Sequence, residues 1–194
     1  MALPEVRYGN SKGSFWIMML VYLFDCVCFY SSSLCQCVYL ILIILALEPD
    51  DSIKSVYSRP FKLAYVITLA EHELSTDLHV ENTSQSEILE FQALLHNYVR
   101  ATADEVKITP LKGLTYYDKT ESTEEGRAAP KLESREEVAV SKFTDSVYED
   151  GSLKYKVFWP DGFLNIKARN FKDVVVWNPQ EEGRKIGDME PDGW

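Results

Sequence analysis

Three histidines are the residues best suited to move a proton near neutral pH, because the imidazole pKa lies close to it. His72 falls in a predicted turn and His79 on the polar side of a predicted strand, so we expect both to be solvated. His96 follows a mainly apolar run at residues 91–95 and precedes an Asn-Tyr-Val sequence, which predicts a partly buried side chain within a strand. A core histidine satisfied by a backbone carbonyl is the simpler interpretation of His96, and a proton-transferring histidine is the alternative.

Two aspartates and one tryptophan have side chains that could recognise a sugar. Asp145 and Asp188 could each accept hydrogen bonds from sugar hydroxyls, or each could occupy a turn. Trp177, which precedes an Asn-Pro pair, could stack on the face of a sugar ring or fill the core, and the core is the commoner role.

Charge and motif content exclude several functions. The 194 residues carry a net charge of -10 and show no basic stripe, so we expect no nucleic-acid partner. Neither a glycine-rich phosphate loop nor a serine-hydrolase elbow is present. The four cysteines follow a C-x-C, six-residue, C-x-C pattern in apolar surroundings, which differs from the usual zinc spacing. We expect these cysteines, Cys26, Cys28, Cys35 and Cys37, to be small buried hydrophobic residues. We therefore predict no metal and no cofactor.

An apolar stretch covers residues 15–47 and contains Asp25 as its single charge. It is long enough to cross a bilayer as a helix, which would anchor the chain to a membrane. Runs of Ile and Leu do not distinguish helix from strand, so residues 39–47 could instead form a buried strand. A third interpretation is that the stretch belongs to no selected fold, as in a misassembled reading frame. The sequence thus divides into a tail (1–14), the apolar segment (15–47) and a larger acidic part (48–194).

Alternating apolar and polar residues in this acidic part predict strands. Phe61–Leu69 and Leu74–Asn82 alternate on either side of a four-residue polar linker, which predicts a hairpin. A second hairpin is predicted at residues 153–168 around a Pro-Asp-Gly turn, and a further strand at residues 172–177. Residues 118–137 are rich in acids and contain Gly126 and Pro130, so we expect a long exposed loop. Many short strands joined by turns predict a sandwich or barrel.

A set of motifs resembles the hexose-6-phosphate mutarotases (glucose-6-phosphate 1-epimerases) of the aldose-1-epimerase group. The matching segments keep the family's order and spacing over about three-quarters of the chain, from Leu45 to Trp194. They are residues 60–65, 74–83, 91–98, 111–119, 144–148, 176–179 and 188–194.

The resemblance implies an all-β, galactose mutarotase-like β-sandwich (a supersandwich) and an isomerase that interconverts the α and β anomers of a hexose 6-phosphate without a cofactor. In such enzymes an acid protonates the ring oxygen while a base removes the proton of the anomeric hydroxyl, and the roles reverse on ring closure. His96 occupies the position of the family's acid, and Asp145 that of its sugar-binding aspartate. We therefore expect the two side chains to lie together in a concavity of the sandwich.

Two of the family's motifs are not found in this sequence. The family's base is a glutamate in a Val-Glu-Pro-Gly segment after the Asp-Gly-Trp stretch that ends this chain, and its phosphate-binding arginine belongs to a His-Gly-Phe-Ala-Arg motif. The sandwich is accordingly expected to be incomplete, and epimerase activity to be impaired. The alternative function is a catalytically inactive carbohydrate-binding or membrane-tethered interaction protein. The resemblance implies a cytoplasmic location, and uncovered apolar strand faces predict self-association.

Overall fold

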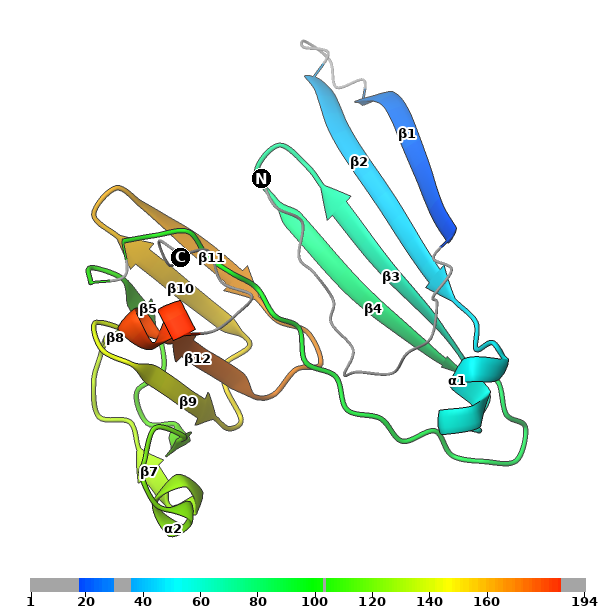
Figure 1. The fold of residues 1–194 in the computed structure, drawn as a ribbon. Helices are drawn as coiled ribbons and strands as arrows, with labels where there is room; N and C mark the ends of the chain where they lie inside the picture. The colour runs from blue at the N-terminus through cyan, green and yellow to red at the C-terminus, as the bar shows by residue number, and fades with distance from the viewer. Residues whose placement is uncertain (1–17, 30–35, 103, 186–194) are drawn as a thin grey trace. The chain divides into compact units, whose positions relative to one another are not determined.

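The computed structural model describes residues 18–29, 36–102 and 104–185, and the chain divides into two compact units, Met1–Asn97 and Tyr98–Trp194. The regular elements of the described residues are mainly antiparallel strands (Figure 1). The all-β class predicted from the alternation is therefore confirmed.

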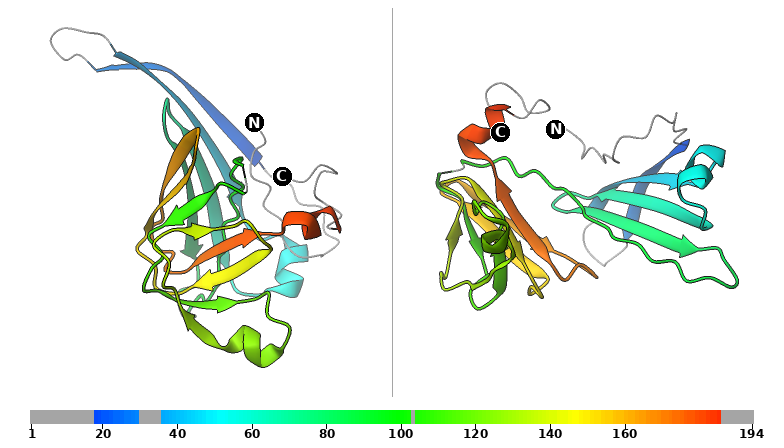
Figure 2. Two further views of the ribbon diagram at one scale, coloured as in Figure 1. Left: turned by 90° about the vertical axis from the view of Figure 1, so that its left-hand side faces the viewer. Right: turned by 60° about the horizontal axis from the view of Figure 1, so that its bottom comes forward.

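The first unit contains one four-stranded antiparallel sheet in the order β1-β2-β3-β4. Figure 2 shows its strands side by side in one twisted layer. The elements are β1 (Met18–Phe29), β2 (Gln36–Leu47), α1 (Asp51–Val56), β3 (Phe61–Leu69) and β4 (Leu74–Asn82). The predicted first hairpin is confirmed with the predicted bounds, since Leu69 pairs with Leu74 and the Ala70 N–H donates to the Glu73 carbonyl oxygen at 2.8 Å.

The apolar segment contributes strands where a membrane helix was one prediction. Residues 39–47 lie within β2, which pairs with β3 from Ile41↔Leu69 to Leu47↔Leu63, so the strand interpretation is confirmed. No helix in the described ranges has the length and apolar character needed to cross a membrane. The helical interpretation of 15–47 is therefore wrong for its described residues, while residues 15–17 and 30–35 lie outside them.

One face of β3, β4 and the described part of β2 is apolar and only half-buried. Paired residues of antiparallel strands point to the same side, so Leu45, Tyr65 and Leu78 share that face. Among the described side chains of the unit, Ile67 is the one buried hydrophobic residue, at 8% exposure. The first unit thus has a continuous hydrogen-bonded ladder, and its described side chains enclose little core.

The second unit is β-sandwich-like, with two four-stranded antiparallel sheets in the orders β11-β10-β5-β8 and β12-β9-β6-β7. Its strands are β5 (Lys107–Thr109), β6 (Thr115–Asp118), β7 (Pro130–Leu132), β8 (Val138–Ala139), β9 (Thr144–Tyr148), β10 (Lys154–Trp159), β11 (Gly162–Lys167) and β12 (Val174–Asn178). Its helices are α2 (Glu124–Ala128) and the 3-10 helix η1 (Gln180–Lys185). Trp159 pairs with Gly162, which confirms the second predicted hairpin, and β12 confirms the last strand.

The core of the second unit is built by residues that both sheets contribute. Tyr155 and Val157 of β10 meet Tyr148 of β9 and Val176 of β12 in one buried cluster, which also contains Val106, Leu111, Val138 and Val140. The apolar face predicted for residues 153–159 is therefore covered, unlike that of β3.

The acidic stretch 118–137 is not the exposed loop that its composition predicts. It contains the helix α2 and the strand β7. Thr123 caps α2, because its hydroxyl oxygen accepts a hydrogen bond from the Gly126 N–H at 3.0 Å. The stretch also carries Glu133, which is only 3% exposed.

Candidate functional site

Asp145 lies in β9, the second strand of the sheet β12-β9-β6-β7, and not in a turn. Its neighbour Ser146 is buried and so is Tyr148, whereas Asp145 itself is half-buried. Because side chains alternate along a strand, Asp145 and Val147 point away from the core toward the outer face of the sheet. The sequence positions Asp145 there through the pattern of small and apolar residues that directs Ser146 and Tyr148 inward.

The Asp145 carboxylate is free to accept hydrogen bonds. No described group donates a hydrogen bond to it, although its backbone carbonyl oxygen accepts one from the Lys119 N–H at 2.7 Å. Partial burial raises the pKa of Asp145, the Lys119 ammonium opposes that rise, and the Asp118 carboxylate adds to it. The net direction is upward, as expected for a carboxylate that is partly removed from water without a donor of its own.

Trp177 lies directly beside Asp145. The two residues pair across β12 and β9, so their side chains share the outer face of the sheet, and β12 runs alongside β9 in Figure 2. Trp177 is 39% exposed, while its neighbour Val176 is buried in the core. The prediction that Trp177 fills the core is therefore wrong, because the alternation of β12 places Val176 there instead. The structure brings together two residues that the sequence analysis had considered separately.

His96 lies in a segment without regular secondary structure between β4 and β5, and its side chain is exposed. The predicted strand at residues 91–98, with a partly buried histidine, is wrong. Phe91 and Leu94 of the same segment are more than half exposed, so the apolar run does not serve a core in this unit. His96 belongs to the first unit and Asp145 to the second. The expected proximity of the two side chains stays a prediction, and Asp188 lies outside the described residues.

The sequence analysis missed one buried carboxylate, that of Glu133, which is hydrogen-bonded to Tyr148 of β9. The Glu133 carboxylate accepts hydrogen bonds from the Arg135 guanidinium, at 2.8 Å from Nε and 2.6 Å from Nη2, and from the Tyr148 hydroxyl at 2.8 Å. The Arg135 N–H donates a further bond at 2.9 Å. Burial alone would raise the pKa of Glu133, but these donors outweigh it and lower the pKa to about 2. A Glu-x-Arg sequence within an otherwise acidic run was the signal that could have identified the pair.

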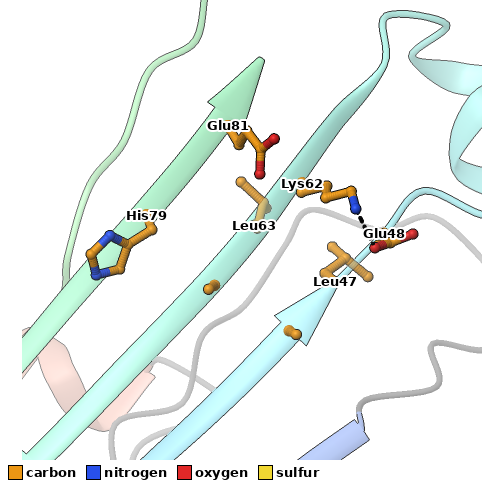
Figure 3. Close-up of a pocket in the computed structure, with 8 residues that line it drawn as sticks. Leu47, Glu48, Lys62, Leu63, His79 and Glu81 are labelled. Carbon is orange, nitrogen blue, oxygen red and sulfur yellow. Dashed lines mark ion pairs between the residues drawn. The ribbon is translucent and has the colours of Figure 1, made fainter. Parts of the chain in front are cut away.

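A shallow pocket of about 210 Å³ opens on β2, β3 and β4 of the first unit (Figure 3). Ala46 and Ala64 are paired in the ladder, and their small side chains leave space between larger neighbours. The remaining lining residues are Leu47, Glu48, Lys62, Leu63, His79 and Glu81. Lys62 is bound to Glu48 at 2.8 Å, and this contact raises the pKa of the ammonium. Because Lys62 is already paired and Glu81 adds a second acid, the pocket offers no free cation to an anionic ligand.

The histidines of the first unit carry no site of their own. His72 and His79 are both exposed, as predicted. Within the described ranges, no group of three His, Cys, Asp or Glu residues is arranged to hold a metal ion. The outer face around Asp145 and Trp177 is therefore the best candidate site.

Comparison of the sequence with known protein families finds no matching family model.

Proposed function

We propose that this chain binds a hexose 6-phosphate on the outer face of the sheet β12-β9-β6-β7 and acts as an isomerase of the hexose-6-phosphate 1-epimerase type. The observation that carries the proposal is the cross-strand pair of Asp145 and Trp177. A carboxylate without a protein donor can accept bonds from two sugar hydroxyls, and an exposed indole offers an apolar surface to a pyranose ring. The motif resemblance independently assigns sugar binding to Asp145.

In the proposed reaction an acid, the role that the motif resemblance gives to His96, protonates the ring oxygen of the sugar, and the C1–O5 bond breaks. The anomeric hydroxyl gives its proton to solvent water, because the sequence does not contain the family's glutamate motif, so the proposed activity is impaired. Rotation about the C1–C2 bond and reversal of both proton transfers give the other anomer. Asp145 holds the sugar hydroxyls during these steps. General acid–base catalysis of this kind contributes roughly 10²–10⁴-fold to a rate.

A second candidate function is carbohydrate binding without catalysis. It is favoured by the surroundings of His96, which is exposed and has no hydrogen-bond partner among the described residues. A catalytic imidazole is usually oriented by a second hydrogen bond that fixes its tautomer.

Nuclear magnetic resonance separates the two functions. Glucose 6-phosphate is added to the full chain, its binding is followed by amide shift changes, and the exchange of its anomeric protons is measured above the spontaneous rate. An epimerase accelerates exchange, and His96→Gln abolishes that acceleration while leaving binding intact. Asp145→Asn weakens binding in either case. Binding without accelerated exchange identifies the inactive module, and the absence of any binding refutes both functions.

A further inference from the structure

Three side chains form a row on the outer face of the second sheet, two of them on β12 and β9 and the third in the turn that follows β6. Trp177 of β12 pairs with Asp145 of β9, and the Lys119 N–H, one residue beyond the end of β6, donates to the Asp145 carbonyl oxygen. Asp118 pairs with Ser146, which sets Lys119 opposite Asp145 in the same register. We call Trp177, Asp145 and Lys119 the outer row. Its two ends are two strand spacings apart, about 10 Å.

Lys119 has hydrogen-bonding capacity to spare. Its Nζ lies 5.1 Å from the centre of the Tyr117 ring and donates one bond, at 3.1 Å, to the Arg127 carbonyl oxygen. An ammonium group has three donors, so two stay available to a ligand. The contact with the Tyr117 ring and the bond to Arg127 hold the ammonium in place, which reduces the entropy that ordering it on a ligand would cost.

Two acids near Lys119 in the sequence, Asp118 and Glu121, do not neutralise it by direct pairing. Asp118 and Glu121 both contact the Lys131 ammonium, at 3.1 and 2.5 Å, so both carboxylates pair with that lysine and neither pairs with Lys119. Asp118 also shares the inward side with Ser146, opposite to the side of the row. Lys119 and Asp145 interact electrostatically without a direct hydrogen bond or ion pair, so each keeps its bonding capacity.

The order of the three groups matches the chemistry of one ligand class. We infer that Lys119 binds the phosphate of a phosphorylated hexose whose hydroxyls bond to Asp145 and whose ring stacks on Trp177. This assignment rests on the proposed function and adds to it the residue that selects phosphorylated over neutral sugars. A cation, a hydroxyl acceptor and an aromatic surface in one line recognise such a ligand from its charged end to its apolar face.

The test compares affinities of the full chain for glucose 6-phosphate and for glucose by amide-shift titration. Lys119→Gln is expected to weaken glucose 6-phosphate binding by about tenfold or more, the effect of losing a charge-assisted bond, and to leave glucose binding unchanged. Lys119→Arg keeps the charge and is expected to retain most of the affinity. Trp177→Ala should weaken the binding of both sugars. Lys154→Gln, which removes an exposed lysine from the other sheet, is the matched control and should change neither affinity.

The outcomes distinguish this inference from the proposed function. Equal glucose 6-phosphate affinities of the wild type and Lys119→Gln overturn the role of Lys119 while the binding function stands. Equal weakening by Lys119→Gln for both sugars also overturns it, because selection of the phosphate would then lie elsewhere. A wild-type chain that binds neither sugar overturns both proposals. The amide spectrum of each variant shows directly whether its second unit keeps the native fold.

Discussion

The substitution Glu133→Gln tests the hydrogen bonds made by the buried Glu133 carboxylate of the second unit. It removes the charge of a carboxylate that is 3% exposed and accepts bonds from Arg135 and Tyr148. The pKa of Glu133 falls from 4.5 to about 2 in the folded chain. At 1.36 kcal/mol per pKa unit, the ionised form of Glu133 contributes about 3 kcal/mol of stability.

The pH dependence of this loss has a definite sign. The folded pKa of Glu133 is the lower one, so the unfolded chain binds more protons between pH 4.5 and about pH 2. The stabilisation is complete above that window and is lost as the pH falls through it. The Glu133→Gln variant has no carboxyl group at this position. The difference in the free energy of unfolding between wild type and variant should therefore be about 3 kcal/mol at pH 7 and should decrease toward zero as the pH approaches 2.

Urea unfolding followed at resolved amide signals of the second unit measures this difference, because two compact units need not unfold together. With slopes of about 1–3 kcal/mol per molar urea, the midpoint should fall by roughly 1–3 M. Glu137→Gln is the matched control: Glu137 pairs with Lys107 at 2.7 Å but is half-exposed, so its loss should cost less than about 1 kcal/mol. A difference under 1 kcal/mol at pH 7, or one that does not change with pH, would refute the reasoning.

Three further predictions concern packing and association. Tyr148→Phe removes one hydrogen-bond donor from Glu133 and should lower the free energy of unfolding in urea by about 2 kcal/mol. Stability should also be lost at a higher pH on acidification, and an unchanged acid transition would contradict this prediction. Val138→Ala truncates a core side chain and should destabilise the second unit by about 2 kcal/mol, whereas exposed Val56→Ala should change nothing measurable; equal effects would refute the core assignment. The half-exposed apolar face of β2, β3 and β4 should make the chain self-associate, so sedimentation velocity should show species that grow with concentration, and a monomer at all concentrations would rule this out.

The strands were predictable from the sequence where each one alternates and is followed by its partner. Phe61–Leu69 and Leu74–Asn82 satisfy both conditions, so even the register of the hairpin follows from four linker residues. The pattern at Gln36–Leu47 is uniformly apolar and carries no period, which left helix and strand open. Its pairing with β3 shows that the segment is a strand. Strand pairing depends on the tertiary structure, so the local sequence could not reveal it.

The errors arise where composition conceals a local interaction. Residues 118–137 read as a solvated loop because acids dominate them, yet Arg135 pairs with Glu133 two residues earlier and lets that carboxylate enter the core. The prediction for His96 is wrong because composition suggested an interaction that is absent. Its apolar flank predicts a strand, but no strand of the described residues pairs with the segment, and an unpaired run of apolar residues does not become a strand by composition alone.

Glu133 and Asp145 show why a strong pKa perturbation does not by itself locate a site. The pKa of Glu133 is shifted further, but Arg135 and Tyr148 donate to both of its oxygens, and that saturation is what stabilises the charge. A ligand could bind Glu133 only by displacing these donors. The pKa of Asp145 is raised, because partial burial removes water from its carboxylate and no described donor replaces it. A hydroxyl that approaches Asp145 beside Trp177 supplies the missing hydrogen bond, so ligand binding should lower the pKa of this carboxyl. An Asp145 pKa that is the same with and without glucose 6-phosphate, measured by carboxyl-carbon shifts, would remove Asp145 from the site.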